Sequence, residues 1–297
     1  MSQQKRISIL TVTDNHYLIL LAALVKSTES HHVSGEMIDL YIVGDRISAR
    51  NIEKFNKSFD LSKINIIWCR MKDVIPKDLI MPTDRTSYPL NIYMRLFFPW
   101  IVKKEVDRIL YLDVDMIVLD DISKLYYSDL GDHIIGAVQD PKISTFDNEW
   151  GGIRNYKVLG FDAKTSYFNT GLLLIDVQKW NAAEISQKVV DCISGNISFL
   201  NYPDQYGLNV VLADKWEHID NRWNTFSYGV ENSAQPFLIH YAQRKPIYRS
   251  YNNGKKSQDL FFYYLHQTAW RNVKLRGETF RYIKKIRNIL RKWIFLK

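Results

Sequence analysis

Short apolar runs alternate with helical patterns along the first quarter of the chain. The region between residues 13 and 63 holds apolar residues at helical spacing over residues 17–27, and Ser48 can cap a helix that runs to about Phe59. Strand, helix, strand, helix, strand at this spacing predicts a parallel sheet covered by helices. The runs that predict buried strands are residues 7–12, 38–43 and 64–69.

The rest of the chain continues this pattern with less regular spacing. Residues 71–89 contain three prolines and are predicted to be irregular, and residues 145–155 form a polar loop that could cover a substrate. Helices are predicted over residues 91–100, 180–194 and 203–212. Further strands are predicted at residues 109–112, 134–138, 172–176 and 237–241, the third of them after a polar turn at residues 169–171, and residues 116–119 form a second short apolar segment. The fold class is therefore α/β.

Composition is typical of a globular enzyme. The chain has 297 residues, of which 46% are hydrophobic and 13% aromatic. Its cysteines, Cys69 and Cys192, form neither a disulfide framework nor a zinc spacing, which favours a reducing compartment. The polar start of the chain does not resemble a signal peptide, and the longest apolar run is too short to span a bilayer. We expect a soluble or peripheral cytoplasmic protein.

The net charge of +8 is concentrated at the end of the chain. Residues 274–297 contain nine basic residues and one acidic residue, whereas the remaining chain has 31 of each. A body without excess positive charge argues against nucleic acid as a partner. We therefore expect one catalytic domain, residues 1–273, followed by a basic tail, residues 274–297.

The tail predicts an amphipathic helix. Its apolar side would carry Tyr282, Ile283, Ile286, Ile289, Leu290, Trp293 and Ile294. Its polar side would carry Arg281, Lys284, Lys285, Arg287, Arg291 and Lys292. Such segregation favours a helix in an anionic membrane interface, at the inner face of the cell membrane. A helix docked on the catalytic domain with a solvated basic face is the main alternative, and a coiled-coil or nucleic-acid role is a further one. On the membrane hypothesis, deleting residues 277–297 should leave donor hydrolysis largely intact.

Two carboxylates stand between apolar segments at Asp113 and Asp115. Burying a carboxylate without a partner costs several kcal/mol or more, so the pair predicts a bound cation. Oxygen ligands suit Mg²⁺ or Mn²⁺, and such an ion often shares its ligands with phosphate groups. The alternative is a solvated turn after a strand, because Asp-X-Asp occurs by chance in many proteins.

Other polar residues have ordinary alternatives as well. Arg95 could form a structural ion pair, His240 could be a structural histidine at a strand end, and Asp204 could stabilise a helix start. Thr11, Asp14 and Asn15 follow the first strand, where ligands bind in parallel sheets. No Gly-X-Gly-X-X-Gly loop is present, which argues against a dinucleotide site.

Four motifs in order resemble those of the family 8 glycosyltransferases, which include glycogenin and bacterial galactosyl- and glucosyltransferases for lipopolysaccharide. The motifs are Tyr-Leu-Asp-Val-Asp at 111–115, Asn-Thr-Gly at 169–171, Asp-Gln at 204–205, and a histidine at 240 followed by Lys-Pro at 245–246. The resemblance extends from about residue 7 to residue 246. It implies a GT-A fold, a Rossmann-like mixed sheet in a single catalytic domain, and retaining transfer of a hexose from a UDP-sugar with Mn²⁺, with Mg²⁺ as the second choice.

The resemblance also implies a role for each site residue. Asp113, Asp115 and His240 would hold the metal, and Gln205, Asp204 and Asp140 would act at the anomeric carbon and the acceptor. The donor would be bound by Thr11, Asp14, Asn15, Arg95, Val114, Asn169, Thr170, Gly171 and Lys245. Two positions depart from the family pattern: Thr13 replaces an acid, and Gln243 stands in a loop that usually has a glycine.

Several questions stay open from sequence alone. A sugar nucleotidyltransferase would share the sheet and carboxylates but should have a Gly-rich basic loop after the first strand, which is missing. A non-catalytic membrane or nucleic-acid adaptor would fit the tail but not the motif series. Glucose and galactose donors are not distinguished, and the acceptor could be a glycan, a lipid-linked saccharide or a glycoprotein. Gln205 is a poor nucleophile, which favours front-face attack over a covalent intermediate.

Overall fold

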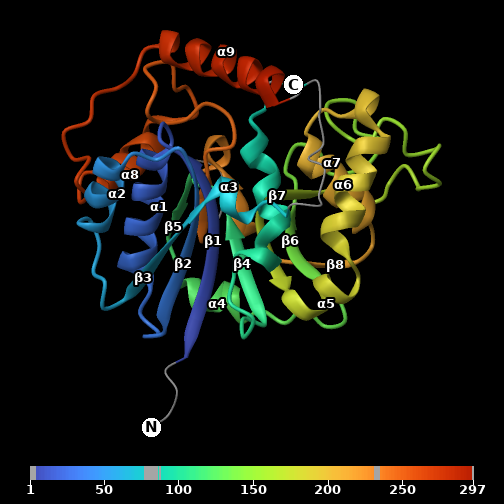
Figure 1. The fold of residues 1–297 in the computed structure, drawn as a ribbon, viewed down its shortest axis with the longest axis horizontal. Helices are drawn as coiled ribbons and strands as arrows, with labels where there is room; N and C mark the ends of the chain where they lie inside the picture. The colour runs from blue at the N-terminus through green and yellow to red at the C-terminus, as the bar shows by residue number, and fades with distance from the viewer. Residues whose placement is uncertain (1–4, 77–85, 87, 231–234, 296–297) are drawn as a thin grey trace.

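A seven-stranded mixed sheet forms the centre of the protein, in a computed structural model that describes residues 5–76, 86, 88–230 and 235–295, with side chains up to residue 290 (Figure 1). In spatial order its strands are β3 (Ile64–Arg70), β2 (Met37–Asp45), β1 (Arg6–Asp14), β4 (Arg108–Leu112), β7 (Phe168–Asp176), β6 (Ile135–Gln139) and β8 (Trp216–His218). The first four strands are mutually parallel, as the sequence predicts for β1, β2 and β3, whereas β7 is antiparallel to both β4 and β6.

A second sheet of three strands lies beside the first. It consists of β5 (Met116–Val118), β10 (Leu238–His240) and β9 (Thr225–Phe226). In this sheet β10 is antiparallel to β5 and pairs His240 with Met116. The late strand of the chain is thereby brought next to the residues that follow β4.

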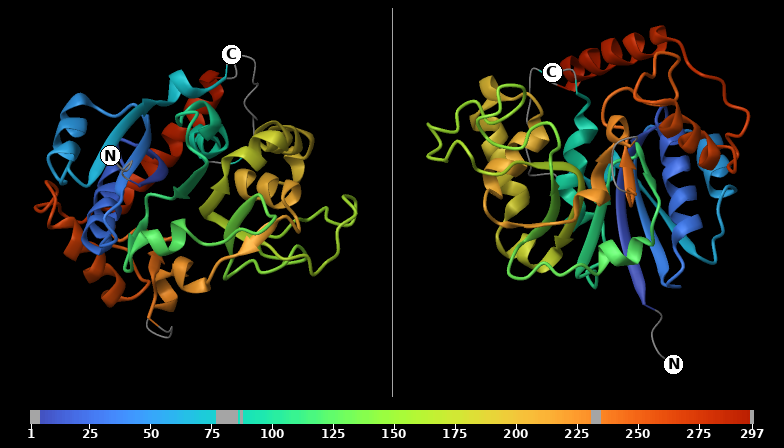
Figure 2. Two further views of the ribbon diagram at one scale, coloured as in Figure 1. Left: turned by 90° about the horizontal axis from the view of Figure 1, so that it is seen from below. Right: turned by 180° about the vertical axis from the view of Figure 1, so that it is seen from behind.

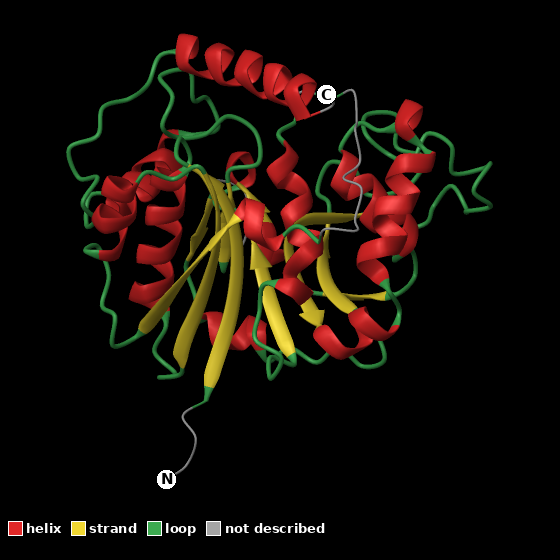
Figure 3. Cartoon of the chain, viewed as in Figure 1, coloured by secondary structure: helices red, strands yellow, loops and turns green. Residues whose placement is uncertain are grey.

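Helices cover both faces of the large sheet (Figure 3). They are α1 (Leu18–His31), α2 (Ala49–Asn56), α3 (Met71–Val74), α4 (Ile122–Tyr126), α5 (Val177–Ala182), α6 (Ile185–Gly195), α7 (Pro203–Val211), α8 (Lys255–Leu265) and α9 (Glu278–Phe295). The 3₁₀ helices are Leu90–Trp100, Ile197–Phe199, Asn221–Asn224 and Ser227–Gly229. No helix in the described part of the chain is long and apolar enough to cross a membrane. Of the irregular segment predicted at 71–89, residues 77–85 and 87 lie outside the described residues.

Three predicted elements differ from the structure. The helix predicted over residues 91–100 is a 3₁₀ helix, Leu90–Trp100, which is interrupted by a non-helical conformation at Phe97. The helix predicted over residues 180–194 is two helices, α5 and α6, because Glu184 adopts a left-handed conformation with φ of 51° between them. After this turn Ser186 accepts a hydrogen bond from Trp180 and donates one to the carbonyl of Leu96, which fixes the new direction. The predicted turn at residues 169–171 lies within β7, at a register shift against β6.

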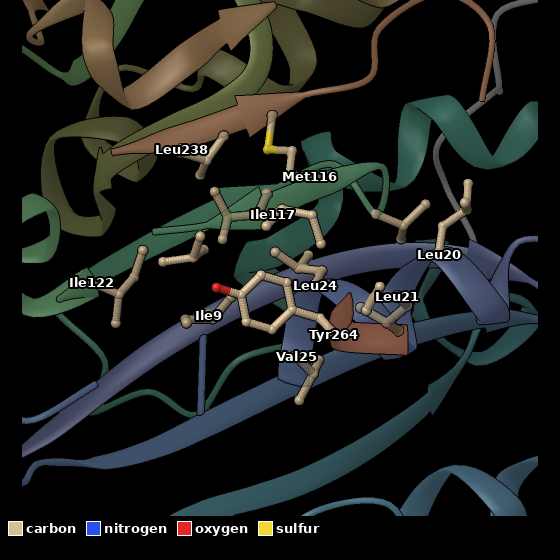
Figure 4. Close-up of a cluster of buried hydrophobic side chains, with 14 of the residues drawn as sticks. Ile9, Leu20, Leu21, Leu24, Val25, Met116, Ile117, Ile122, Leu238 and Tyr264 are labelled. Carbon is tan, nitrogen blue, oxygen red and sulfur yellow. The ribbon is translucent and has the colours of Figure 1, made fainter. Parts of the chain in front are cut away.

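The hydrophobic core lies on both faces of the large sheet. In β4, Leu110 and Leu112 join the cluster that includes α1 and α8, whereas Ile109 and Tyr111 join the cluster that includes α6 and α7. This alternation explains why the strand is apolar at every position. Figure 4 shows the first cluster, in which Leu20, Leu21 and Leu24 of α1 face Met116 and Ile117 of β5.

Strand register places several chain segments at one edge of the large sheet. β1 and β4 are parallel neighbours, so Asp14 and Asp113 leave the sheet at the same edge. Because β7 is antiparallel to β4, its first residues return to that edge, where Leu112 pairs with Leu172. β6 ends there too, with Gln139 opposite Phe168. In Figure 1, α9 crosses the molecule above this edge, and the rear view in Figure 2 agrees.

Candidate active site

The acidic cluster at the sheet edge is built from residues that are far apart in the chain. Ligand atoms of Asp113, Asp115 and His240 lie within 4.8 Å of one another. The His240 Nε2 atom is 3.7 Å from Asp115 Oδ1 and 4.0 Å from Asp113 Oδ2. The peptide nitrogen of Tyr241 donates to the carbonyl of Asp115 at 2.8 Å, so the small sheet itself joins the two segments.

Asn224 orients the His240 ring. The Asn224 amide nitrogen donates to the Asn169 side chain at 3.0 Å, which leaves the Asn224 Oδ1 atom as the acceptor for His240 Nδ1 at 2.9 Å. Nδ1 therefore carries the proton, and Nε2 presents its lone pair to the two carboxylates. Burial lowers the pKa of His240, although Asp115 and Asp113 act against this, and a neutral imidazole is the form that binds metals.

Gly171 permits the close approach of these groups. A Cβ atom at this position would lie 2.6 Å from His240 Cε1 and 3.0 Å from Asp113 Oδ2. The Asp113 peptide nitrogen also donates to the Gly171 carbonyl at 2.7 Å. A side chain here would therefore collide with the candidate metal ligands.

The donor atoms at the centre of the site suit a divalent cation. Two carboxylates, Asp113 and Asp115, converge there with the His240 imidazole, and Arg95 forms an ion pair with Asp113. Lys245 forms an ion pair with Asp115. Burial tends to raise the pKa of Asp115, but the charge and the hydrogen bond of Lys245 act against it, so the pKa is lowered and the carboxylate stays ionised. These donors fit Mn²⁺ or Mg²⁺.

Arg95 connects the carboxylate pair to α7. Its Nη2 atom donates to Asp113 at 3.0 Å, its Nε atom lies 3.1 Å from Asp204 Oδ2, and its Nη1 atom donates to the Thr170 carbonyl at 2.6 Å. Burial tends to lower the pKa of Arg95, but Asp113 and its other neighbours raise it overall. Burial raises the pKa of Asp204, and Arg95 offsets part of this effect. Arg95 therefore forms ion pairs, which is the alternative considered from its sequence, but it forms them inside the active site.

A second network joins Gln205 to Asp140. The Gln205 Oε1 atom accepts from the Thr170 peptide nitrogen at 3.1 Å and from its hydroxyl at 3.2 Å, and Gln205 Nε2 donates to Asp140 at 3.4 Å. The same Asp140 oxygen accepts a hydrogen bond from Asn169 at 2.8 Å. The other Asp140 oxygen accepts hydrogen bonds from the peptide nitrogens of Lys142 and Ile143. The structure therefore brings together four residues that the sequence predicts for the site: Asp140, Asn169, Thr170 and Gln205.

These groups line a cavity of about 840 Å³ at the sheet edge. Asp14 and Val114 also line it, but two of the predicted donor residues do not. Thr11 is buried within β1, and its hydroxyl has no hydrogen-bond partner among the described residues. Asn15 accepts from the Ser48 peptide nitrogen and from Asn51, so it stabilises the start of α2 instead.

The structure adds residues that sequence reasoning missed. Tyr111 donates from its hydroxyl to Asp113 at 2.7 Å, and burial raises its pKa well above the usual value. A tyrosine in a buried strand should have a partner for its hydroxyl, so this contact could have been anticipated. No sequence pattern distinguishes Asn224. Lys284 of α9 is the third, since it reaches Asp14 from the predicted tail.

A mixed sheet that gathers an Asp-X-Asp pair and a histidine at its edge defines a glycosyltransferase of the GT-A class. Comparisons with known proteins agree. The profile described as Glycosyl transferase family 8 matches residues 8–246. The chain therefore belongs to glycosyl transferase family 8, as the motifs in its sequence indicate.

Individual relatives are distant. General stress protein A of Bacillus subtilis is 23% identical over 292 residues, which cover 92% of this chain and 98% of that protein. The glycosyltransferase GlyF of Streptococcus pneumoniae is 25% identical over 94% of this chain, which spans 66% of GlyF. The solved structure of the galactosyltransferase LgtC with donor and acceptor sugar analogues has a TM-score of 0.72 and 22% identity, covering 88% of this chain and 96% of LgtC. This likeness shows the GT-A fold.

Proposed function

We propose that the protein transfers glucose or galactose from a UDP-sugar to a saccharide-bearing acceptor, with retention of configuration. The observation that carries this proposal is the Asp113, Asp115 and His240 cluster in a cavity of about 840 Å³, a volume suited to a nucleotide sugar. Names of relatives support a hexose: one is the lipopolysaccharide 1,2-glucosyltransferase of Escherichia coli, 26% identical over 63% of this chain, and LgtC is a galactosyltransferase.

Asp113, Asp115 and His240 would hold Mn²⁺, with Mg²⁺ as the second choice. A bound ion would neutralise negative charge on the departing UDP. Lys245 supplies a second positive charge from the protein, since its ammonium lies at Asp115 and lines the cavity. This ammonium is placed to bind a phosphate oxygen of the donor.

Side-chain hydrogen bonding supports front-face attack. The Gln205 oxygen is occupied by Thr170, and Asp204 is held by Arg95. Asp140 accepts hydrogen bonds on both oxygens, so it is poorly suited to form a covalent intermediate. The bond between the anomeric carbon and the UDP oxygen would break with its electron pair passing to UDP. The acceptor oxygen would bond to the same face and release its proton to a β-phosphate oxygen.

We also propose that the acceptor lies at the inner face of the cell membrane and that α9 binds the anionic surface. Tyr282, Ile283 and Ile286 are 60%, 56% and 58% exposed, so the apolar face of α9 points away from the protein. The tail prediction also includes four side chains that lie outside the described part of the structure, those of Arg291, Lys292, Trp293 and Ile294. An exposed apolar face bordered by cations suits a lipid interface.

A donor panel tests the enzymatic part of this proposal without a known acceptor. We expect UDP release from UDP-glucose or UDP-galactose with Mn²⁺, and loss of nearly all release in Asp115→Ala or in excess chelator. Asp132→Ala is the matched control and should behave as the wild type. It removes an exposed carboxylate just before β6 begins, at the opposite end of that strand from the site. Failure to release UDP from any UDP-sugar, or full release by Asp115→Ala, would contradict the proposal.

A further inference from the structure

The tail helix α9 forms part of the wall of the donor cavity. Its inner face contributes Arg281, Lys284, Lys285 and Asn288 to the lining, whereas Ile283 and Ile286 face outward. Figure 1 shows α9 lying across the sheet edge at which β1 ends. Basic residues that the sequence assigns to a solvated or membrane-facing side therefore face the catalytic groups.

Lys284 forms an ion pair from this inner face. Its ammonium lies 2.8 Å from Asp14 Oδ2 and 3.1 Å from the centre of the Tyr17 ring, and its side chain is 14% exposed. Asp14 is held in place from the other side, because its Oδ1 atom accepts the peptide nitrogens of His16 and Tyr17. A lysine is rarely buried on the polar side of an amphipathic helix unless its charge has a specific partner.

Other cations surround Lys284. Burial lowers its pKa to about 8; Asp14 opposes this change, whereas the nearby Lys245 and Arg276 add to it by repulsion. Lys245 is paired with Asp115 and Lys284 with Asp14, so two lysine–carboxylate pairs stand next to each other along the cavity. Cations placed close together in this way are matched best by a polyanion that lies between them.

The helix acts as a wall of the cavity and does not fill it. About 840 Å³ remains open with α9 docked, which is within the usual range for a ligand pocket. Asp14, Val114 and the carboxylate pair all line this one cavity. A nucleotide with its ribose near Asp14 and its terminal phosphate near Asp115 would pass its diphosphate along Lys284 and Lys245.

We infer that Lys284, carried by α9, binds the diphosphate of the nucleotide donor and exchanges its contact with Asp14 for a phosphate oxygen. The inference rests on the proposed use of a UDP-sugar. It makes α9 a component of the donor site, and the same helix then presents its apolar face outward. Lys284 adds to the charge that Lys245 provides and leaves the Asp14 carboxylate available to the ribose.

Titration calorimetry with UDP and Mn²⁺ tests this role without relying on turnover. Lys284→Met should weaken UDP binding by about tenfold or more, the usual effect of losing a hydrogen bond to a charged group. Binding of uridine, which has no phosphate, should change much less. Lys284→Arg should retain most of the UDP affinity, because it keeps the charge. The comparison with uridine shows whether Lys284→Met has instead disturbed the site as a whole.

Arg287→Met is the matched control, since it removes an exposed cation of α9 that does not line the cavity. It should bind UDP as the wild type does. UDP binding by Lys284→Met that equals or exceeds wild-type binding would overturn the inference, and so would equal losses for UDP and uridine. If the wild type bound uridine and UDP alike, or neither, the proposed donor itself would be wrong.

Discussion

Hydrogen bonds to other polar side chains hold many of the side chains of the active site in place. The Asn169 side chain accepts hydrogen bonds from Gly171 and Asn224 and donates one to Asp140. The Asn224 oxygen in turn accepts a hydrogen bond from His240. Removing one member leaves buried donors or acceptors without partners, which costs about 1–3 kcal/mol for each group. The motif residues could be predicted from their resemblance to a family, but Asn224 could not, because it ends a 3₁₀ helix of four residues that is too short to leave a periodic pattern.

Gln205→Ala tests this network at the reacting centre. We expect kcat to fall on the order of 10²-fold, with little change in the KM for the donor, because the proposed contacts of Gln205 strengthen as the anomeric carbon becomes positive. Steady-state kinetics of UDP release would separate the two constants. Gln187→Ala, on the exposed face of α6, is the control. A rise in KM alone would place Gln205 away from the anomeric carbon.

At the scale of elements, strand register brings the site together. The apolar runs predict most of the strands, including the buried β4, because burial on both faces leaves a clear signal. The start of β7 was wrongly predicted as a turn. Asn169 and Gly171 are residue types that are depleted in strands, but pairing with β6 and contacts to Gln205 keep this segment extended. Tertiary contacts of this kind cannot be read from a local pattern.

Gly171→Ala tests the close packing of β7 against the metal ligands. The added Cβ would meet His240 and Asp113, so we expect a several-fold higher Mn²⁺ concentration for half-maximal UDP release and a lower rate. The melting temperature should fall by only a few degrees, because overpacking costs about 1–3 kcal/mol while the strand hydrogen bonds are retained. Gly195→Ala is the control, since nothing lies within 4 Å of its added Cβ. An unchanged requirement for Mn²⁺ would mean that the ligands can move apart without loss.

Across the whole molecule, α9 joins the donor cavity to an exposed apolar surface. Hydrophobic periodicity correctly predicts a helix here, but it does not reveal which face is covered. The expected rule is apolar inside, and α9 reverses it because Lys284 has Asp14 as a partner. Deletion of residues 277–297 should therefore weaken donor hydrolysis, contrary to the expectation from sequence. Point substitutions on the outer face are the better test of membrane binding.

The double variant Ile283→Ser with Ile286→Ser should reduce binding to anionic vesicles while UDP release stays near the wild-type rate. Each side chain is more than half exposed and contributes no atom to the cavity lining, so the donor site should be unaffected. Losing two interfacial isoleucines should remove roughly 2–4 kcal/mol of binding energy, or more than tenfold in affinity. Sedimentation with phosphatidylserine-containing vesicles at low and high salt measures this loss.

Val158→Ser is the control, because it changes an exposed apolar residue in a loop away from α9, and it should sediment as the wild type does. Equal sedimentation of the double variant and the wild type would show that the outer face of α9 does not bind the membrane.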